Sequence, residues 1–193
     1  MPDFSIEKSL SNKVIALDEV GRGPLAGPVV SCALIFLDMS IDLIELNFIN
    51  DSKKLSFIKK KQALKKIYLL KKLNKIKYKL GFASVDEVDK LNILEATKLS
   101  MKRAVKKLNR PPTQLIIDGN IDLKLKDFPS IGIIKGDEKS ISIAAASIIA
   151  KIHRDRYMRC LSYKFPNYNW SSNAGYGTKK HIEQIMKNGI TVH

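Results

Sequence analysis

The chain has 193 residues and a formal net charge of +15 at pH 7, because 34 Lys and Arg outnumber 19 Asp and Glu. Its length suits one well-buried domain, and 45% apolar with 27% charged residues is typical of a globular protein. No apolar run approaches the ~20 residues of a membrane-spanning helix, and the N-terminus lacks the apolar core of a signal peptide. We therefore expect a cytoplasmic protein with no membrane partner, whose positive charge favours nucleic acid as its partner.

The stretch VIALDEVGRGPLAGPVV, residues 14–30, predicts a buried strand that delivers two carboxylates to a glycine-rich loop. Its first four residues are apolar, Asp18 and Glu19 follow, and three glycines then let the backbone approach a ligand closely. The loop matches neither nucleotide-binding fingerprint, since GRGPLAG is not GxGxxG and no Gly-Lys-Ser/Thr follows. Acids and glycines after a strand are also common in solvated turns, so this segment alone leaves both interpretations open.

The residues that follow predict two more strands and two helices. Residues 28–37 are apolar and predict a strand antiparallel to the first. Residues 56–74 place apolar side chains at helical spacing with lysines between them, which predicts a helix with one basic face. Residues 76–84 alternate apolar and polar side chains, the pattern of a half-exposed strand. Residues 86–108 repeat apolar side chains at helical spacing and predict one long helix that ends before two prolines.

Two further apolar runs, residues 115–117 and 131–134, predict strands that lead toward Asp118 and Asp137, each beside a glycine. Three predicted strands therefore end in acid next to glycine. Because ligands of open α/β sheets bind beyond strand ends, these acids could meet there. Clustered carboxylates raise one another's pKa values and need a compensating cation. Mg²⁺ or Mn²⁺ prefers oxygen ligands and supports phosphodiester hydrolysis, which predicts metal-assisted cleavage of nucleic acid.

The remainder of the chain predicts a helix over residues 140–160, whose first part has small or apolar side chains almost all round. Such a helix packs tightly on a sheet. An aromatic loop and a short last helix follow. We therefore expect a main domain over residues 1–161 and a small helical and loop segment over residues 162–193 that packs on it.

Six segments, in chain order, resemble ribonuclease HII: DEVGRGPLAGPVV, DSKKLS, LNILEAT, IDGN, KGDEKSISIAAASIIAKIHRDR and GYGTKKH. The resemblance covers nearly the whole chain. It implies an α/β protein with a ribonuclease H-like fold, in which a mixed five-stranded sheet is flanked by helices and followed by a short helical C-terminal extension. This fold agrees with the order of strands and helices predicted above.

The resemblance also implies an activity, the endonucleolytic hydrolysis of the RNA strand of RNA/DNA hybrids. It implies incision 5′ to single ribonucleotides embedded in duplex DNA, giving 3′-hydroxyl and 5′-phosphate ends, as in ribonucleotide removal and primer removal. The implied cofactor is Mg²⁺ or Mn²⁺, and the implied partners are hybrid and ribonucleotide-containing duplex DNA. We expect a monomer, and the ending MKNGITVH shows no sliding-clamp motif of the kind that archaeal members can carry.

On the pattern of the family, four carboxylates bind metal and catalyse the reaction: Asp18, Glu19, Asp118 and Asp137. Glu138 and Asp155 compete for the fourth place. Asp137 is preferred because it follows a strand end, like the other acids. Asp155 lies inside a helix between two arginines, where a structural ion pair suits it better.

The resemblance also implies a loop that senses the ribose 2′-hydroxyl, formed by Gly21, Arg22 and Gly23. Tyr176 would lie beside this loop, although an aromatic residue in such a segment is often a packed core residue. Lys53 and Lys54 resemble the phosphate-contacting turn of the family, or they are solvated charges of a lysine-rich chain. Ala174 departs from the pattern, because the family usually has a basic residue at this position, so a phosphate contact there is in doubt.

Two rival interpretations share some of these features. In the first, the chain is a non-catalytic basic protein that binds nucleic acid, its acids are surface turns, and its binding does not depend on magnesium. In the second, it is another metal nuclease of the same fold, such as a junction resolvase or a longer-substrate ribonuclease H relative, which needs the acids but not Gly-Arg-Gly with Tyr176.

Overall fold

The computed structural model describes residues 1–10, 13–49, 57–109, 114–125 and 128–193. Its centre is a five-stranded sheet in the order β3-β2-β1-β4-β5. The strands are β1 (Val14–Val20), β2 (Val29–Phe36), β3 (Ile76–Ala83), β4 (Gln114–Asp118) and β5 (Ser130–Ile133). β2 is antiparallel to β1 and β3, whereas β4 is parallel to β1 and β5 is parallel to β4. The predicted ribonuclease H-like fold with a mixed five-stranded sheet is therefore confirmed.

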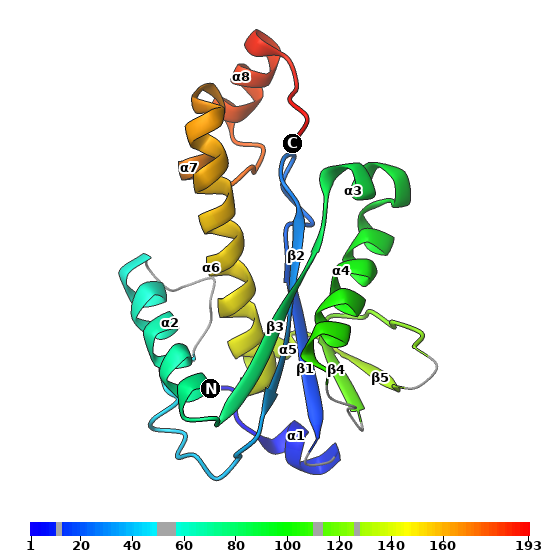
Figure 1. The fold of residues 1–193 in the computed structure, drawn as a ribbon, viewed down its shortest axis with the longest axis vertical. Coiled ribbons are helices and arrows are strands. Elements are labelled where there is room, and N and C mark those ends of the chain that lie inside the picture. The colour runs from blue at the N-terminus through cyan, green and yellow to red at the C-terminus, as the bar shows by residue number, and fades with distance from the viewer. Residues whose placement is uncertain (11–12, 50–56, 110–113, 126–127) are drawn as a thin grey trace.

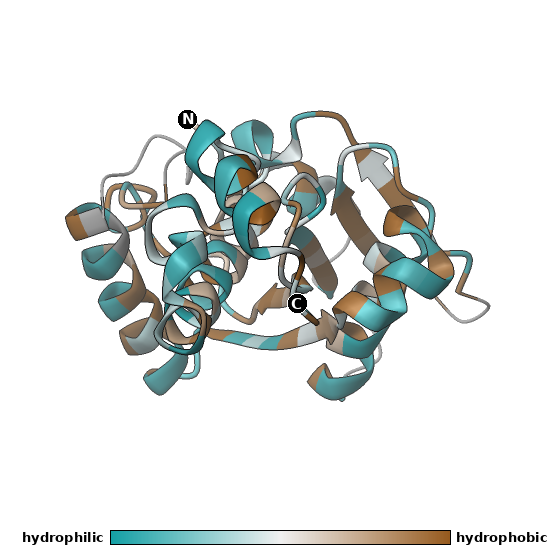
Figure 2. Ribbon diagram, turned by 90° about the horizontal axis from the view of Figure 1, so that it is seen from above, coloured by the Kyte–Doolittle hydropathy of each residue, from teal (hydrophilic) through white to brown (hydrophobic). Residues whose placement is uncertain are grey.

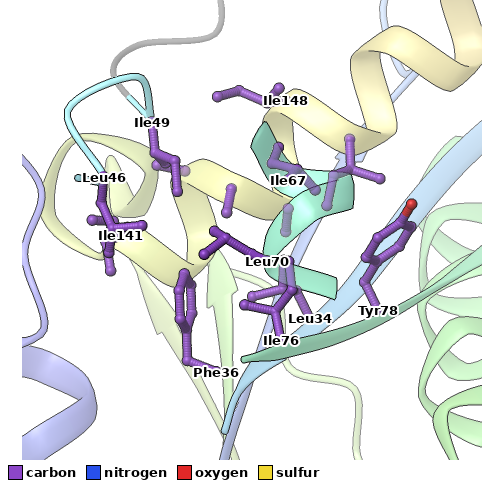
Figure 3. Close-up of a cluster of buried hydrophobic side chains, with 14 of the residues drawn as sticks. Leu34, Phe36, Leu46, Ile49, Ile67, Leu70, Ile76, Tyr78, Ile141 and Ile148 are labelled. Atoms are coloured by element: carbon purple, nitrogen blue, oxygen red, sulfur yellow. The ribbon is translucent and has the colours of Figure 1, made fainter. Parts of the chain in front are cut away.

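Helices cover both faces of this sheet (Figure 1). α2 (Phe57–Lys72) and α6 (Ile141–Lys164) lie on one face, and α4 (Ile93–Leu108) lies on the other. Strand β2 is buried along its whole length, so its side chains supply both cores alternately. Leu34 and Phe36 join the cluster under α2 and α6, which Figure 3 shows, and Ala33 and Ile35 join the cluster under α4.

The hydropathy of the elements follows from this layering. The central strands are mostly hydrophobic, whereas hydrophilic and hydrophobic residues alternate along the outer helices (Figure 2). β3, at the edge of the sheet, alternates buried and more exposed residues as its sequence predicts from Ile76 to Lys79. Beyond Lys79 the prediction is wrong, because Gly81 is buried and Phe82 is exposed. None of the helices in the described part of the chain is long and apolar enough to span a bilayer.

The helix predicted over residues 86–108 is two helices, α3 (Val85–Leu91) and α4, so that prediction is wrong in one respect. The break is at Asn92, whose backbone has φ of 73° and ψ of 164°, a positive-φ conformation that no helix residue adopts. Its side-chain oxygen then accepts hydrogen bonds from the backbone N–H groups of Leu94 and Glu95, which caps α4. Apolar periodicity continues across this break, which is why spacing alone predicted one helix.

Helix α6 is the element on which the site is built. Ser140 caps its start by accepting from the backbone N–H of Ile143, and the short helix α5 (Gly136–Lys139) precedes it. The buried carboxylate of Glu7, on α1 (Ser5–Leu10), accepts from the Ser140 hydroxyl at 2.7 Å and from the Ser142 N–H at 3.1 Å. These contacts fix the start of α6 against the N-terminal segment.

The C-terminal part packs on the far end of α6 through the 3₁₀ helix η1 (Pro166–Tyr168), α7 (Trp170–Asn173) and α8 (Lys179–Asn188) (Figure 1). Its core is Trp170, whose indole N–H donates to His181 at 2.9 Å and whose rings stack on Tyr168. The boundary that we placed after residue 161 falls inside α6, which continues to Lys164.

Candidate active site

Two parallel neighbouring strands bring the first carboxylates together. Ala16 of β1 pairs with Ile116 of β4, and both pack against Ile143 of α6. Because side chains alternate along a strand, the residues two positions further on face α6 as well. These residues are Asp18 and Asp118.

A cavity of about 260 Å³ opens where the two strands end. It is lined by Asp18, Glu19, Val20, Gly21, Arg22, Gly23, Asp118, Ser147, Lys151 and Tyr176. The structure therefore unites three of the four predicted carboxylates, the whole Gly-Arg-Gly loop and the predicted tyrosine around one space.

Two carboxyl groups of this cavity, those of Asp18 and Glu19, have raised pKa values. Burial is the main cause that holds the pKa of Asp18 well above its usual range, and the neighbouring Glu19 and Asp118 raise it further. The Ser147 hydroxyl and the backbone N–H of Glu19, the latter 2.7 Å from Asp18 Oδ1, act in the opposite direction. Burial also raises the pKa of Glu19, against the effect of Arg22 at 3.3 Å. Such a cluster favours a cation that would stabilise the charged forms.

The donor set fits a divalent cation. Glu19 Oε2 is buried and has no hydrogen-bond partner among the described residues, so one carboxylate oxygen is available as a ligand. All three carboxylates offer oxygen, which Mg²⁺ and Mn²⁺ prefer. Within the described ranges, no group of three or more His, Cys, Asp or Glu side chains is placed to hold a metal ion. Binding would therefore require these side chains to move, and water would complete the coordination.

The fourth predicted carboxylate, Asp137, is the neighbour in sequence of a residue that contacts Asp118. Asp118 Oδ1 accepts from the backbone N–H of Gly136 at 2.7 Å, which fixes the start of α5 to the end of β4. Asp137 follows Gly136 and is buried, but it is not among the described residues that line the cavity. Its role as fourth acid stays a prediction.

The two competitors for this role lie elsewhere. Glu138 is exposed on α5. Asp155, on α6, forms an ion pair with Lys151 at 2.8 Å rather than with the arginines beside it in sequence, and it lines a neighbouring cavity.

The glycine loop has the shape that its sequence requires. Gly21 has φ of +112°, and a Cβ there would lie 2.5 Å from the carbonyl oxygen of Pro28 and 2.7 Å from Nε of Arg154. Only glycine fits both the conformation and the space. A Cβ on Gly23 would lie 3.6 Å from Cε1 of Tyr176, so the loop and the tyrosine border each other.

Tyr176 belongs to the cavity and not to the core. Its side chain is 41% exposed, and Lys151 Nζ lies 5.6 Å from the centroid of its ring. Lys53 and Lys54, the predicted phosphate contacts, lie outside the described residues, and their role stays a prediction.

Sequence reasoning missed three residues of α6: Ser147, Lys151 and Arg154. They are four and then three positions apart, which places them on one helical face toward the cavity and its loop. Ser147 and Lys151 line the cavity, and the buried Arg154 lies behind the loop. Their i, i+4, i+7 spacing along α6 was the available signal.

A ribonuclease H-like sheet with carboxylates at the ends of β1 and β4 beside a glycine loop defines a nuclease of the ribonuclease H class. Residues 15–193 match the sequence model of the family Ribonuclease HII. Ribonuclease HII of Wolbachia pipientis subsp. Culex pipiens (strain wPip) is 50% identical over 192 residues, covering 100% of this chain and 93% of that protein. The chain belongs to the ribonuclease HII family.

Solved structures show the same fold. The ribonuclease H2 from Pyrococcus horikoshii OT3 is 26% identical with a TM-score of 0.73, covering 93% of this chain and 90% of that one. Bst-RNase HIII, solved in complex with Mn²⁺, has a TM-score of 0.68 at 20% identity and covers 98% of this chain and 67% of that one. The protein is therefore an RNA/DNA hybrid-specific endoribonuclease of a family that depends on divalent metal. The two rival interpretations, a non-catalytic binder and another nuclease of this fold, are wrong.

Proposed function

We propose that this endoribonuclease also incises duplex DNA on the 5′ side of a single embedded ribonucleotide, leaving 3′-hydroxyl and 5′-phosphate ends. Such a cut would begin the removal of ribonucleotides and of RNA primers from DNA. One observation carries the proposal: the Gly21 to Gly23 loop and Tyr176 border each other at the rim of the carboxylate cavity. To recognise a single ribose, a site needs groups that contact the sugar beside the phosphate that reacts.

The carboxylates supply the reactive part of the site. Asp18, Glu19 and Asp118 would hold the divalent ion, either Mg²⁺ or Mn²⁺, with Asp137 as the fourth acid. When bound, such an ion activates a water molecule and stabilises the leaving oxygen of a phosphodiester. Lys151, whose ammonium group is paired with Asp155, lies at the same cavity and can donate hydrogen bonds toward the substrate phosphate.

The loop supplies the discrimination. The ribose 2′-hydroxyl both donates and accepts hydrogen bonds, and deoxyribose lacks it. Two of the three loop residues have no side chain, so their backbone groups can come within hydrogen-bonding distance of the sugar. Tyr176 would pack against the neighbouring deoxyribose. A site that pairs a hydroxyl rejects substrates without it, because its polar groups are then left unmatched.

The test is to incubate the protein with three duplexes, carrying one ribonucleotide, a continuous RNA strand or DNA only, and to map every cut. We expect cleavage of the first two with Mg²⁺ or Mn²⁺, none with EDTA, and a cut immediately 5′ to the single ribonucleotide. Cleavage of the hybrid without cleavage of the single-ribonucleotide duplex would reject the proposal and leave the hybrid-specific activity in place.

A further inference from the structure

A second cavity, of about 340 Å³, adjoins the catalytic cavity. The two share Lys151 and Tyr176, so these side chains form the boundary between them. The second cavity is further lined by Asp155, Arg159, Ser171, Ser172, Asn173 and Ala174. One wall is therefore α6, and the other is α7 with the residue that follows it. A nucleic-acid strand that left the catalytic cavity past Tyr176 would therefore enter this space.

The α6 wall carries a net positive charge. Lys151, Asp155 and Arg159 follow one another at intervals of four residues, so they lie along one face of the helix. Lys151 and Asp155 form an ion pair at 2.8 Å, which balances one cation against the one carboxylate of this wall. Arg159 is the second cation of this wall. A guanidinium presents several N–H donors in a planar fork that matches the geometry of phosphate.

The opposite wall offers small polar groups at a fixed place. Ser171 and Ser172 are exposed and present hydroxyls to the cavity. Asn173 is buried and holds the turn, because it donates to the carbonyl oxygen of Tyr168 at 2.8 Å and accepts from the N–H of Gly175 at 2.8 Å. Arginine, lysine and serine side chains are the usual protein contacts of backbone phosphates.

We propose that this second cavity binds a backbone phosphate of the cleaved strand, on the deoxyribonucleotide side of the ribonucleotide, with Arg159 as its main cation. The strand direction rests on the proposed function, in which Tyr176 packs against the neighbouring deoxyribose. The cavity then holds the strand beyond the tyrosine while Gly21 and Gly23 contact the ribose. Binding of this phosphate would add affinity for the strand, and the glycine loop would discriminate between ribose and deoxyribose.

The first test changes the charge of the cavity in both directions. Arg159→Ala should raise KM for a continuous hybrid about fivefold or more, with kcat nearly unchanged, and should flatten the log–log salt dependence by roughly one phosphate contact. Ala174→Lys, alone or combined with Arg159→Ala, should lower KM again, because it adds a cation to the same cavity. Position 174 already holds a residue with a side chain at φ of 49°, so lysine there adds a charge without requiring a new backbone conformation.

Arg156→Ala is the matched control, since Arg156 is exposed on the same helix and is not among the described residues that line either cavity. It removes the same charge and should leave KM almost unchanged. Ser171→Glu is a second variant on the opposite wall, which should raise KM through repulsion even if Arg159→Ala lowers stability. Thermal melting of each variant separates weakened binding from misfolding.

The second test locates the phosphate. Substrates with one methylphosphonate at successive positions should show a site on the 3′ side of the cut where neutralisation weakens wild-type binding but no longer weakens Arg159→Ala. An unchanged KM and salt slope in Arg159→Ala and Ser171→Glu, or methylphosphonate effects that stay full size in Arg159→Ala at every position, would overturn the proposal. Measuring KM and salt dependence on a continuous hybrid keeps the first test readable even if single ribonucleotides are not incised.

Discussion

The buried guanidinium of Arg154 donates from Nη1 to the carbonyl oxygen of Ala174 at 2.7 Å. The same side chain donates to the carbonyl oxygens of Ala26 and Pro28, both at 2.9 Å. One residue of α6 therefore joins the end of the glycine loop to the turn that carries Tyr176. Burial lowers the pKa of this guanidinium from its high ordinary value, so it lies here at a desolvation cost that its three carbonyl contacts offset.

We predict that Arg154→Lys reduces selectivity for single ribonucleotides more than it reduces cleavage of a continuous hybrid. A lysine ammonium cannot reach three carbonyls in a planar fork, so the loop and the turn lose their fixed spacing. Leaving a buried carbonyl unsatisfied should also cost about 1–3 kcal/mol of stability. The measurements are kcat/KM on both substrates and urea unfolding, with Arg156→Lys as the control. A lower stability with an unchanged ratio of the two activities would make Arg154 a purely structural residue.

Much of the fold was predictable because its signals are local. An apolar run followed by acid and glycine marks the ends of β1 and β4, and their parallel pairing then places Asp18 and Asp118 together. The interruption at Asn92 was not predictable from apolar spacing, since one residue with a positive φ breaks the helix without changing the pattern. Its detection depends on recognising an Asn that can both end one helix and cap the next.

The site was predictable only as far as its residues lie in strands and loops with recognisable motifs. The roles of Ser147 and Arg154 depend on which face of α6 turns toward the sheet ends, and that is decided by tertiary packing. Motif spacing also could not show that Lys151 pairs with Asp155. Asp137 shows that a sequence motif does not fix the position of a side chain. It matches the family pattern, but it is not among the described residues that line the cavity.

For the metal site, we predict that Asp18→Asn or Asp118→Asn lowers kcat by about 10²-fold or more, because each removes a charged ligand and changes the electrostatics of the reacting phosphate. Neither change should destabilise the metal-free fold, since each relieves repulsion among buried carboxylates. Thermal melting in EDTA should show variants at least as stable as the wild type. Added Mg²⁺ should stabilise the wild type more than the variants. Near-normal turnover in either variant contradicts the assignment of these ligands.

The raised pKa of Asp18 also predicts a pH effect on the metal-free protein. The ordinary pKa of this carboxyl group is near 3.8, and in the folded state the group keeps its proton at pH values above that. Between pH 3.8 and the raised pKa, the folded state therefore binds more protons than the unfolded state. Its contribution to stability is therefore lost as pH rises through this window. Urea unfolding in EDTA from pH 4 to pH 8 should show a steeper loss in wild type than in Asp18→Asn. Parallel curves would contradict burial as the cause.

Far from the site, the ion pair between α3 and α4 predicts the opposite pH dependence. Arg103 donates to both carboxylate oxygens of Glu87, at 2.6 and 2.7 Å, and the N–H of Ser84 donates to Glu87 as well. Chiefly the Arg103 contact lowers the pKa of Glu87 from 4.5 to about 2. This stabilisation is present above the unfolded pKa near 4.5 and is lost as pH falls through about 2.

The variant for this prediction is Glu87→Gln, which removes the charge but keeps an oxygen that can accept from the Ser84 N–H and complete the capping box. Between pH 5 and pH 2, wild type should lose more stability than Glu87→Gln in urea unfolding, while cleavage at pH 7.5 stays the same. If both proteins lose stability equally over that range, the ion pair contributes nothing measurable, as is common for exposed pairs.

The last prediction concerns Tyr176, whose ring lies between the two cavities and near Lys151. Tyr176→Ala should lower kcat/KM for a single-ribonucleotide duplex about tenfold, equivalent to ~1.4 kcal/mol, because the neighbouring sugar loses its packing surface. A continuous hybrid should suffer less, since it offers a ribose at every position. Tyr176→Phe keeps the ring and should retain most activity, which separates packing from the hydroxyl. With a side chain that is 41% exposed, neither change should move the melting temperature by more than a few degrees. A large drop in melting temperature with normal activity per folded molecule would show that Tyr176 is a packing residue and that sugar recognition lies elsewhere.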